Sequence, residues 1–140
     1  MAQEEEVVLV RRPLEVVGGV LLVVREGGVG LIDRGEEVAA KYLEELGYRI
    51  VARNYRTRWG EIDIIARDGP VLAFVEVRRR NSRSLAHPAE TVGRTKRDRL
   101  ARTAADFLGN RGWWHFVCRF DVVTVTEGEE PEVRLIRDAF

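Results

Sequence analysis

Charged and apolar side chains alternate in two neighbouring segments of this 140-residue chain. The first segment reads Glu61-Ile62-Asp63, and the second reads Glu76-Val77-Arg78. Side chains of a strand point alternately to opposite faces, so the charged residues of each segment share one face. Carboxylates that meet on a sheet repel each other, and a hard divalent cation relieves that repulsion. The two segments therefore predict a Mg²⁺ site, with Mn²⁺ as an alternative metal.

A turn between these segments predicts a β-hairpin. With a two-residue turn at Asp68-Gly69, a preferred turn sequence, Glu61 lies opposite Glu76 and Asp63 lies diagonal to Glu76. Diagonal neighbours on a sheet are about 7–8 Å apart, within reach of a bridging cation. A cation there would polarise a phosphodiester and activate water, while Arg78 would stabilise the transition state. The alternative is an exposed sheet face whose acids pair with nearby arginines.

The surrounding elements can be predicted from periodicity and from capping residues. A capping box at Asp33 and Glu36 begins a helix that ends at Gly47. A second helix runs from about residue 89 or 91 to Leu108 and ends at Gly109. Strands are expected at 48–54, 60–67, 71–78, 114–125 and 133–136. This order predicts an α/β fold with a mixed β-sheet flanked by helices.

The first 32 residues are rich in Val and Gly and predict short strands. We interpret 1–32 as an N-terminal β extension and 33–140 as the main domain. Such strands could extend a sheet or form a contact in a homodimer.

Composition excludes several classes of protein. One cysteine, Cys118, cannot form an internal disulfide, and the longest nearly apolar run is too short to cross a bilayer. The acidic start lacks the positive charge typical of a signal peptide. We therefore expect a cytoplasmic protein that does not bind membranes.

The net charge of zero is a sum of unlike parts. Residues 48–120 carry sixteen bases and seven acids, a balance of +9, whereas both flanking parts are acidic. A basic region of this kind could bind a nucleic-acid backbone, or it could be an ordinary solvated surface. The candidate nucleic-acid-binding residues flank the hairpin or lie on the second helix: Arg53, Arg56, Arg58, Arg79, Arg80 and Lys96. Trp59, among these arginines, could stack on an unpaired base or simply pack against its neighbours.

Several motifs, taken in order, resemble the YraN family of uncharacterised proteins over about residues 33–125. They are Gly35-Glu36, Gly47-Tyr48, Arg53-Asn54, Gly60 to Ala66, Phe74 to Arg78, Lys96 and Arg119 to Val123. That family is similar to the PD-(D/E)XK nucleases and to archaeal Holliday-junction resolvases. The resemblance implies a restriction-endonuclease-like core and Mg²⁺-dependent phosphodiester hydrolysis.

On this resemblance, Asp63 and Glu76 hold the metal, and Glu36 points into the catalytic site. The capping box offers Glu36 a purely structural role instead. The motif has a lysine two residues after its second acid, where this chain has Arg78. Arginine keeps the charge but does not easily lose a proton, and Lys96 is a candidate substitute.

Three functions follow from these residues. The leading hypothesis is a nuclease that acts on structured or branched DNA, with Glu36, Asp63, Glu76 and Arg78 as catalytic residues. The second is a nucleic-acid-binding module of the same fold in which Arg78 impairs catalysis. The third is a non-enzymatic scaffold that oligomerises through its N-terminal strands.

Overall fold

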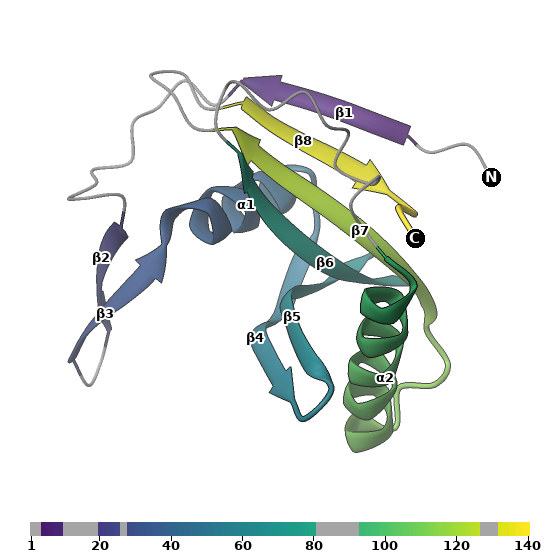
Figure 1. The fold of residues 1–140 in the computed structure, drawn as a ribbon. Helices are drawn as coiled ribbons and strands as arrows, with labels where there is room; N and C mark the ends of the chain where they lie inside the picture. The colour runs from purple at the N-terminus through teal and green to yellow at the C-terminus, as the bar shows by residue number, and fades with distance from the viewer. Residues whose placement is uncertain (1–3, 10–19, 26–27, 81–92, 127–131) are drawn as a thin grey trace.

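The structure, a computed structural model, describes residues 4–9, 20–25, 28–80, 93–126 and 132–140. Two helices and eight strands form in these ranges (Figure 1). The helices are α1 (Arg34–Glu45) and α2 (Arg94–Arg111). The strands are β1 (Glu4–Leu9), β2 (Val20–Arg25), β3 (Gly28–Asp33), β4 (Arg49–Thr57), β5 (Gly60–Asp68), β6 (Val71–Arg80), β7 (Val117–Thr126) and β8 (Glu132–Arg137).

Six strands form one mixed sheet in the order β1-β8-β7-β6-β5-β4. β6 and β7 are parallel, and the other neighbouring strands are antiparallel. A parallel pair needs a crossover connection, and α2 lies in the connection between β6 and β7. The predicted α/β fold with a mixed sheet is confirmed.

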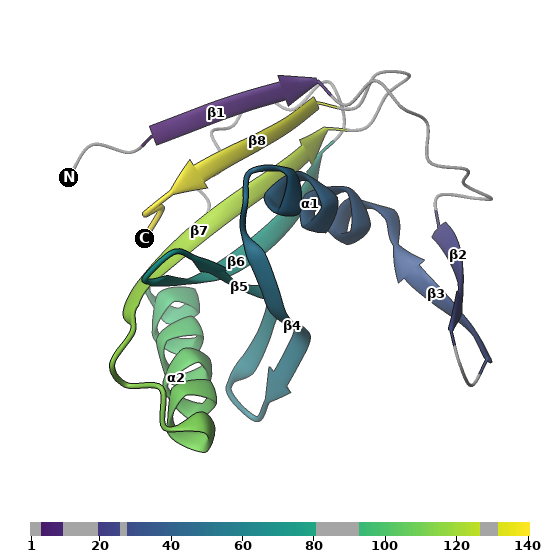
Figure 2. The ribbon, with the colours of Figure 1, turned by 180° about the vertical axis from the view of Figure 1, so that it is seen from behind.

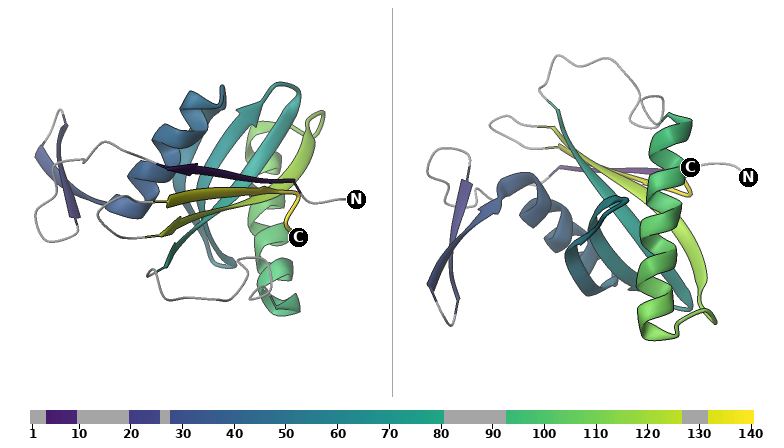
Figure 3. Two further views of the ribbon diagram at one scale, coloured as in Figure 1. Left: turned by 90° about the horizontal axis from the view of Figure 1, so that it is seen from above. Right: turned by 60° about the horizontal axis from the view of Figure 1, so that its bottom comes forward.

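Each helix covers one face of the sheet (Figure 3). Ala39 and Leu43 of α1 pack in a buried cluster with Ala73 and Val75 of β6. The alternate residues of β6 point the other way, and Phe74 packs in a cluster with α2. The central strands are therefore buried on both faces, which accounts for their nearly continuous apolar sequence.

The second helix ends later than the sequence predicts. α2 continues through Gly109 and Asn110 and stops at Gly112, which has a φ of 66° and donates its N–H to Leu108 O. A left-handed residue closes a helix, and glycine adopts this conformation without a steric penalty. The predicted start at residue 89 or 91 lies outside the described residues.

The N-terminal strands divide between two sheets. β1 pairs with β8, so that Glu4 lies opposite Arg137 at the sheet edge. β2 and β3 form a separate two-stranded sheet, and the hairpin stands apart from the six-stranded sheet (Figure 2). The proposed boundary between the N-terminal extension and the main domain stays a prediction. Among the described residues, no helix is long and apolar enough to cross a membrane.

Candidate active site

The hairpin of β5 and β6 places the two predicted metal ligands side by side. The ladder between the two strands ends at the pair of Ile64 and Val75, and Asp63 and Glu76 are the next residues beyond that pair. Both acids line the same cleft. The Val77 N–H donates a hydrogen bond of 2.8 Å to Asp63 Oδ2. Asp63 and Glu76 share the face of the hairpin that α2 covers, because Phe74 on that face packs against α2.

The register of this hairpin corrects the sequence prediction. Asp68 pairs with Val71, so the turn residues are Gly69 and Pro70 rather than Asp68 and Gly69. Proline has no N–H to donate and is excluded from the paired position that the predicted register gave it. Gly69 has a φ of 59°, a conformation that suits a tight turn. Asp63 and Glu76 are consequently the first residues beyond the end of the ladder, and Phe74 pairs with Ile65 rather than with Asp63.

Burial and negative neighbours make the Asp63 carboxylate costly to ionise. The pKa of Asp63 is raised from 3.8 to about 6. Burial is the largest cause, the Val77 hydrogen bond acts in the opposite direction, and the charges of Glu36, Glu76 and Glu61 add smaller increases. The charged form of Asp63 is therefore disfavoured in the folded chain.

Two basic side chains hold Glu76. Arg78 Nη2 lies 3.1 Å from Glu76 Oε2, and both side chains are nearly buried. Lys96 Nζ forms an ion pair with the other carboxylate oxygen, Oε1. Lys96 comes from the first turns of α2, and its side chain is half exposed. Each carboxylate oxygen of Glu76 thus has its own cationic partner.

The N-terminal glutamate of the predicted site approaches from α1. Glu36 lies close enough to Asp63 for its charge to raise the pKa of Asp63. With its amide nitrogen turned toward the acids, Asn54 donates to Glu36 Oε2 at 3.0 Å and to Glu61 Oε1 at 3.1 Å. Asn54 therefore links the α1 glutamate to β5, where Glu61 begins the acidic segment.

A cleft of about 210 Å³ lies between the hairpin and α2, and we call it the acidic cleft. Glu36, Asn54 and Arg78 contact or approach its acids but are not among the residues that line it. Its polar wall contains Glu61, Asp63, Glu76 and Lys96. Phe74 and other apolar residues close the inner side. An apolar wall lowers the local dielectric and strengthens the charge interactions at the site.

The donor set of the acidic cleft fits a magnesium ion with an open coordination sphere. In the part of the chain that the structure describes, no group of three or more His, Cys, Asp or Glu side chains forms a metal cage. Mg²⁺ is commonly bound by one or two carboxylates and keeps several waters. Asp63 and Glu76 would provide two neighbouring hard ligands of this kind, and the pKa of Asp63 is raised mainly by burial and further by the acids around it.

The structure separates the predicted nucleic-acid-binding residues into two groups. Arg53 is tied to α1 through Glu37, with Nη1 to Oε2 at 2.9 Å. The remaining residues that can be described are exposed near the hairpin or α2: Arg56, Arg58, Arg79 and Lys96. Arg56 pairs with Glu61 at 3.2 Å, and the side chain of Arg80 lies outside the described residues.

Sequence reasoning missed two parts of this region. Asn54 has a φ of 52°, and asparagine is one of the few residues that tolerates this conformation, but nothing in the local pattern connects it with Glu36. The stacking of Arg102 on Trp59, at 4.6 Å from the ring centroid, joins α2 to the turn between β4 and β5. Such a contact between distant segments leaves no trace in sequence spacing.

The fold and the hairpin of β5 and β6 indicate the class of protein to which this chain belongs. A mixed sheet with a helix on each face is consistent with the restriction-endonuclease-like core that the sequence predicts. The sequence pattern described as "Uncharacterised protein family UPF0102" matches residues 35–125. The chain therefore belongs to the UPF0102 family, also called YraN, which confirms the resemblance seen in the sequence.

Individual relatives agree with this assignment. A UPF0102 protein of Symbiobacterium thermophilum is 49% identical over 110 residues, which cover 77% of this chain and 93% of the relative. A UPF0102 protein of Alkaliphilus metalliredigens is 44% identical over 106 residues, or 76% of this chain and 93% of the relative. A UPF0102 protein of Chlorobaculum tepidum is 52% identical over 91 residues, or 65% of this chain and 70% of the relative.

Proposed function

We propose that this protein is a Mg²⁺-dependent nuclease that hydrolyses phosphodiester bonds in structured or branched DNA. The observation that carries the proposal is the pair of neighbouring carboxylates in the acidic cleft. Asp63 and Glu76 line this cleft together just beyond the end of the ladder, and burial, with smaller contributions from neighbouring acids, raises the pKa of Asp63 to about 6. Arg78 and Lys96 compensate the charge of Glu76, whereas the charged form of Asp63 is costly for folding alone, and a divalent cation would offset that cost.

Each side chain then has a separate task. Asp63 and Glu76 hold the metal, which when bound polarises the phosphodiester and activates water. Glu36 orients water or a metal ligand from the α1 side of the cleft. Arg78, nearly buried beside Glu76, stabilises negative charge on the phosphate in the transition state.

Lys96 brings a lysine to Glu76 from α2, whereas the motif has its lysine two residues after the second acid. Its amine contacts Glu76 Oε1 from α2, while Arg78 occupies the motif position on β6 and contacts Oε2. Because lysine can release a proton far more readily than arginine, Lys96 is the better candidate for a proton-transfer role. The DNA substrate, a homodimer and a cytoplasmic location belong to the same proposal.

The test is cleavage of labelled DNA by the purified chain. Duplex, single-stranded, flap and four-way-junction DNA are incubated with Mg²⁺, with Mn²⁺ and with chelator. We expect cleavage of a branched substrate that requires metal and falls about 10²–10⁴-fold in Asp63→Asn and Glu76→Gln. These variants, purified identically, also control for contaminating nucleases. Equal cleavage by the parent and both variants would contradict the site.

A second candidate function is a nucleic-acid-binding module that no longer cleaves. Arg78 favours it, because this residue stands where the motif has lysine and already bonds to Glu76. In that case the parent chain binds branched DNA without cutting it, and Arg78→Lys gains metal-dependent cleavage. A parent that cleaves as well as Arg78→Lys would reject this alternative.

A further inference from the structure

We propose that a groove beside the acidic cleft binds an unpaired single-stranded DNA segment, with Trp59 as the platform on which a base stacks. This inference names the part of the substrate that lies next to the cut, and its choice of ligand rests on the proposed nuclease function. The groove runs between the β4–β5 turn and α2, and we call it the Trp59 groove. Its main residues are Arg58, Trp59, Gly60, Thr95, Arg99 and Arg102.

The Trp59 groove has the dimensions of a ligand site. Two adjoining hollows of about 450 and 650 Å³ share Trp59, Gly60 and Arg99 in their walls. Ligand-binding pockets in proteins commonly have volumes of about 300–1,000 Å³. Either hollow is therefore large enough for a nucleotide.

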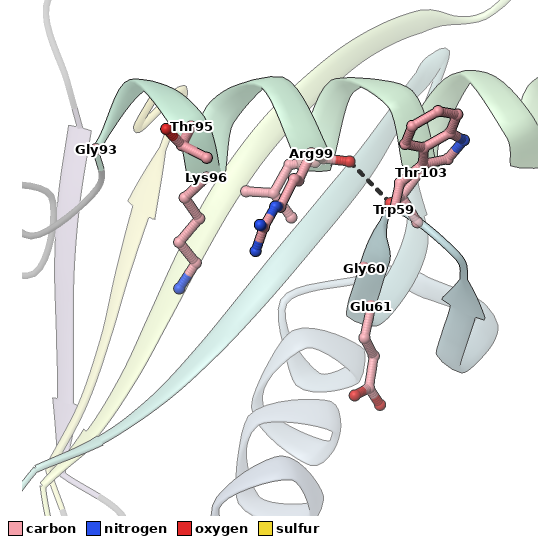
Figure 4. A pocket seen from close by; sticks show the side chains of 9 residues that line it. Trp59, Gly60, Glu61, Gly93, Thr95, Lys96, Arg99 and Thr103 are labelled. Atoms are coloured by element: carbon pink, nitrogen blue, oxygen red, sulfur yellow. Dashed lines mark hydrogen bonds between the residues drawn. The ribbon is translucent and has the colours of Figure 1, made fainter.

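The groove leads directly into the acidic cleft. Glu61, Lys96 and Leu100 line both the smaller hollow and the acidic cleft. Figure 4 shows Lys96 and Arg99 projecting from the same side of α2, with Trp59 farther along the helix beside Thr103. A strand lying in the groove would thus reach the proposed metal ligands at the end marked by Lys96.

The position of Trp59 is fixed by its neighbours. Its backbone N–H donates to Thr57 Oγ1 at 3.1 Å, and that hydroxyl lies 3.3 Å from Thr103 Oγ1 on α2. Gly60, with a φ of 153°, begins β5 immediately after it, and a Cβ there would lie 3.8 Å from Thr103 Oγ1. The turn is therefore held against α2, and the indole has a defined place in the groove.

Charge and aromatic surface occur together in the groove. Arg58 and Arg102 lie over the Trp59 ring at 4.3 and 4.6 Å from its centroid. Arg99 adds a third guanidinium, and Asp98 is the acid on the same wall. Guanidinium groups bind phosphates, and both guanidinium and indole planes stack on bases.

These contacts favour an unpaired strand over a duplex. The bases of a duplex are stacked on each other and face its interior, so an indole in a hollow does not reach their planes. An unpaired base exposes its face. It can therefore replace one of the two arginines that stack on the indole, and the displaced arginine can then bind a phosphate. A surface that bound only a duplex backbone would need the arginines but not the tryptophan.

The test compares two DNA ligands in chelator, where cleavage cannot occur. Fluorescence anisotropy measures the binding of labelled oligothymidylate and of a blunt duplex at low salt. We expect Trp59→Leu to weaken oligothymidylate binding about tenfold, the range of one lost base stack, and Trp59→Phe to keep most of it. Binding of the duplex should change less than about twofold, since it depends on phosphate contacts.

Trp114→Leu is the matched control, because Trp114 is 63% exposed and lies outside the groove. Circular dichroism and thermal unfolding confirm that the variants fold. An equal loss for both ligands, or no loss in Trp59→Leu, would overturn the inference. Because no metal or cleavage is involved, the groove can be confirmed when the nuclease proposal fails, and rejected when the nuclease proposal holds.

Discussion

Two aspartates of the sheet differ in how the protein compensates their charge. Asp121 on β7 is fully buried, and both of its carboxylate oxygens accept hydrogen bonds. Arg119 donates to each oxygen, at 2.8 and 3.0 Å, and Tyr48 and the Asp138 N–H complete the set. Asp63 on β5 accepts a bond from Val77 and is otherwise surrounded by acids that raise its pKa.

The pKa values of the neighbouring groups reflect this difference. Burial raises the pKa of Tyr48 to about 12, with a further contribution from the charge of Asp121. Burial disfavours the charge of Arg119, yet hydrogen bonds to Asp121 and Asp68 raise its pKa overall. The hydrogen bonds and charges around Asp121 therefore balance one another, and this network has a structural role. Among the groups of the described ranges, no basic side chain is a main cause of the shift in the pKa of Asp63, which is the arrangement that our proposed metal site requires.

The largest difference between the two aspartates should appear in folding stability. Asp121→Asn places an amide NH₂ against the donors Arg119 and Tyr48 and leaves Arg119 with less compensation for its charge. We expect the free energy of unfolding to fall by about 3–5 kcal/mol, as for other broken buried ion pairs. Urea unfolding at pH 7 measures this change. If the free energy of unfolding fell by less than about 1 kcal/mol, Asp121 would not have the structural ion-pair role that distinguishes it from Asp63.

Asp63→Asn should have the opposite effect in metal-free protein. In the folded chain the pKa of Asp63 is about 6, above the value of 3.8 for an ordinary aspartate. Folding therefore disfavours the charged form of Asp63. The parent loses no stability from this below pH 3.8, loses more as the pH rises toward 6, and bears the full loss above pH 6. The shift corresponds to roughly 3 kcal/mol, and about 1–3 kcal/mol of added stability is expected for the variant at pH 7.

Urea unfolding in chelator at pH 4, 5, 6 and 7 tests this linkage. The stability of Asp63→Asn relative to the parent should increase from pH 4 to about pH 6 and level off toward pH 7. Saturating Mg²⁺ should reduce the difference by stabilising the parent alone. Glu44→Gln, a change of an exposed acid on α1, is the control for a general effect of charge. A constant difference from pH 4 to pH 7 would contradict the raised pKa.

The smallest effect is expected at the basic partners of Glu76. Lys96→Met removes the α2 amine, and we expect DNA cleavage to fall about tenfold, because this lysine is half exposed and its charge is partly screened. Arg78→Lys should change the rate by less, since the positive charge is retained. Lys41→Met, at an exposed position of α1, is the control. Cleavage rates under single-turnover conditions make the comparison, and unchanged cleavage by Lys96→Met would exclude a role for the amine.

The comparison of these sites also shows what the sequence could predict. Period-two alternation was enough to place Asp63 and Glu76 on one face, because that inference depends only on parity. The turn was misplaced by one residue, since Asp68-Gly69 and Gly69-Pro70 are both reasonable local turns and the ladder decides between them. The pairing of β1 with β8, which sets Glu4 opposite Arg137, depends on contacts between the two ends of the chain.

Side-chain contacts between distant elements were the least predictable. Lys96 could be proposed only as a substitute for the missing lysine, and its contact with Glu76 depends on how α2 crosses the sheet. Asp121 appeared in the sequence as one acid in an apolar strand, with nothing to reveal that Tyr48 and Arg119 surround it. Local sequence patterns predict which residues share a face and where helices and strands lie, whereas the compensation of a charge depends on contacts in the packed fold.

Mn²⁺ binding at pH 7 tests the central claim most directly, namely that Asp63 and Glu76 bind a divalent cation that compensates the charge of Asp63. Electron paramagnetic resonance of free Mn²⁺ during a titration counts the bound ions without any DNA. We predict that the parent binds Mn²⁺, that Mg²⁺ competes for the same site, and that Asp63→Asn loses the binding while Glu44→Gln keeps it. Equal binding by the parent and Asp63→Asn, or no binding by the parent, would contradict the account.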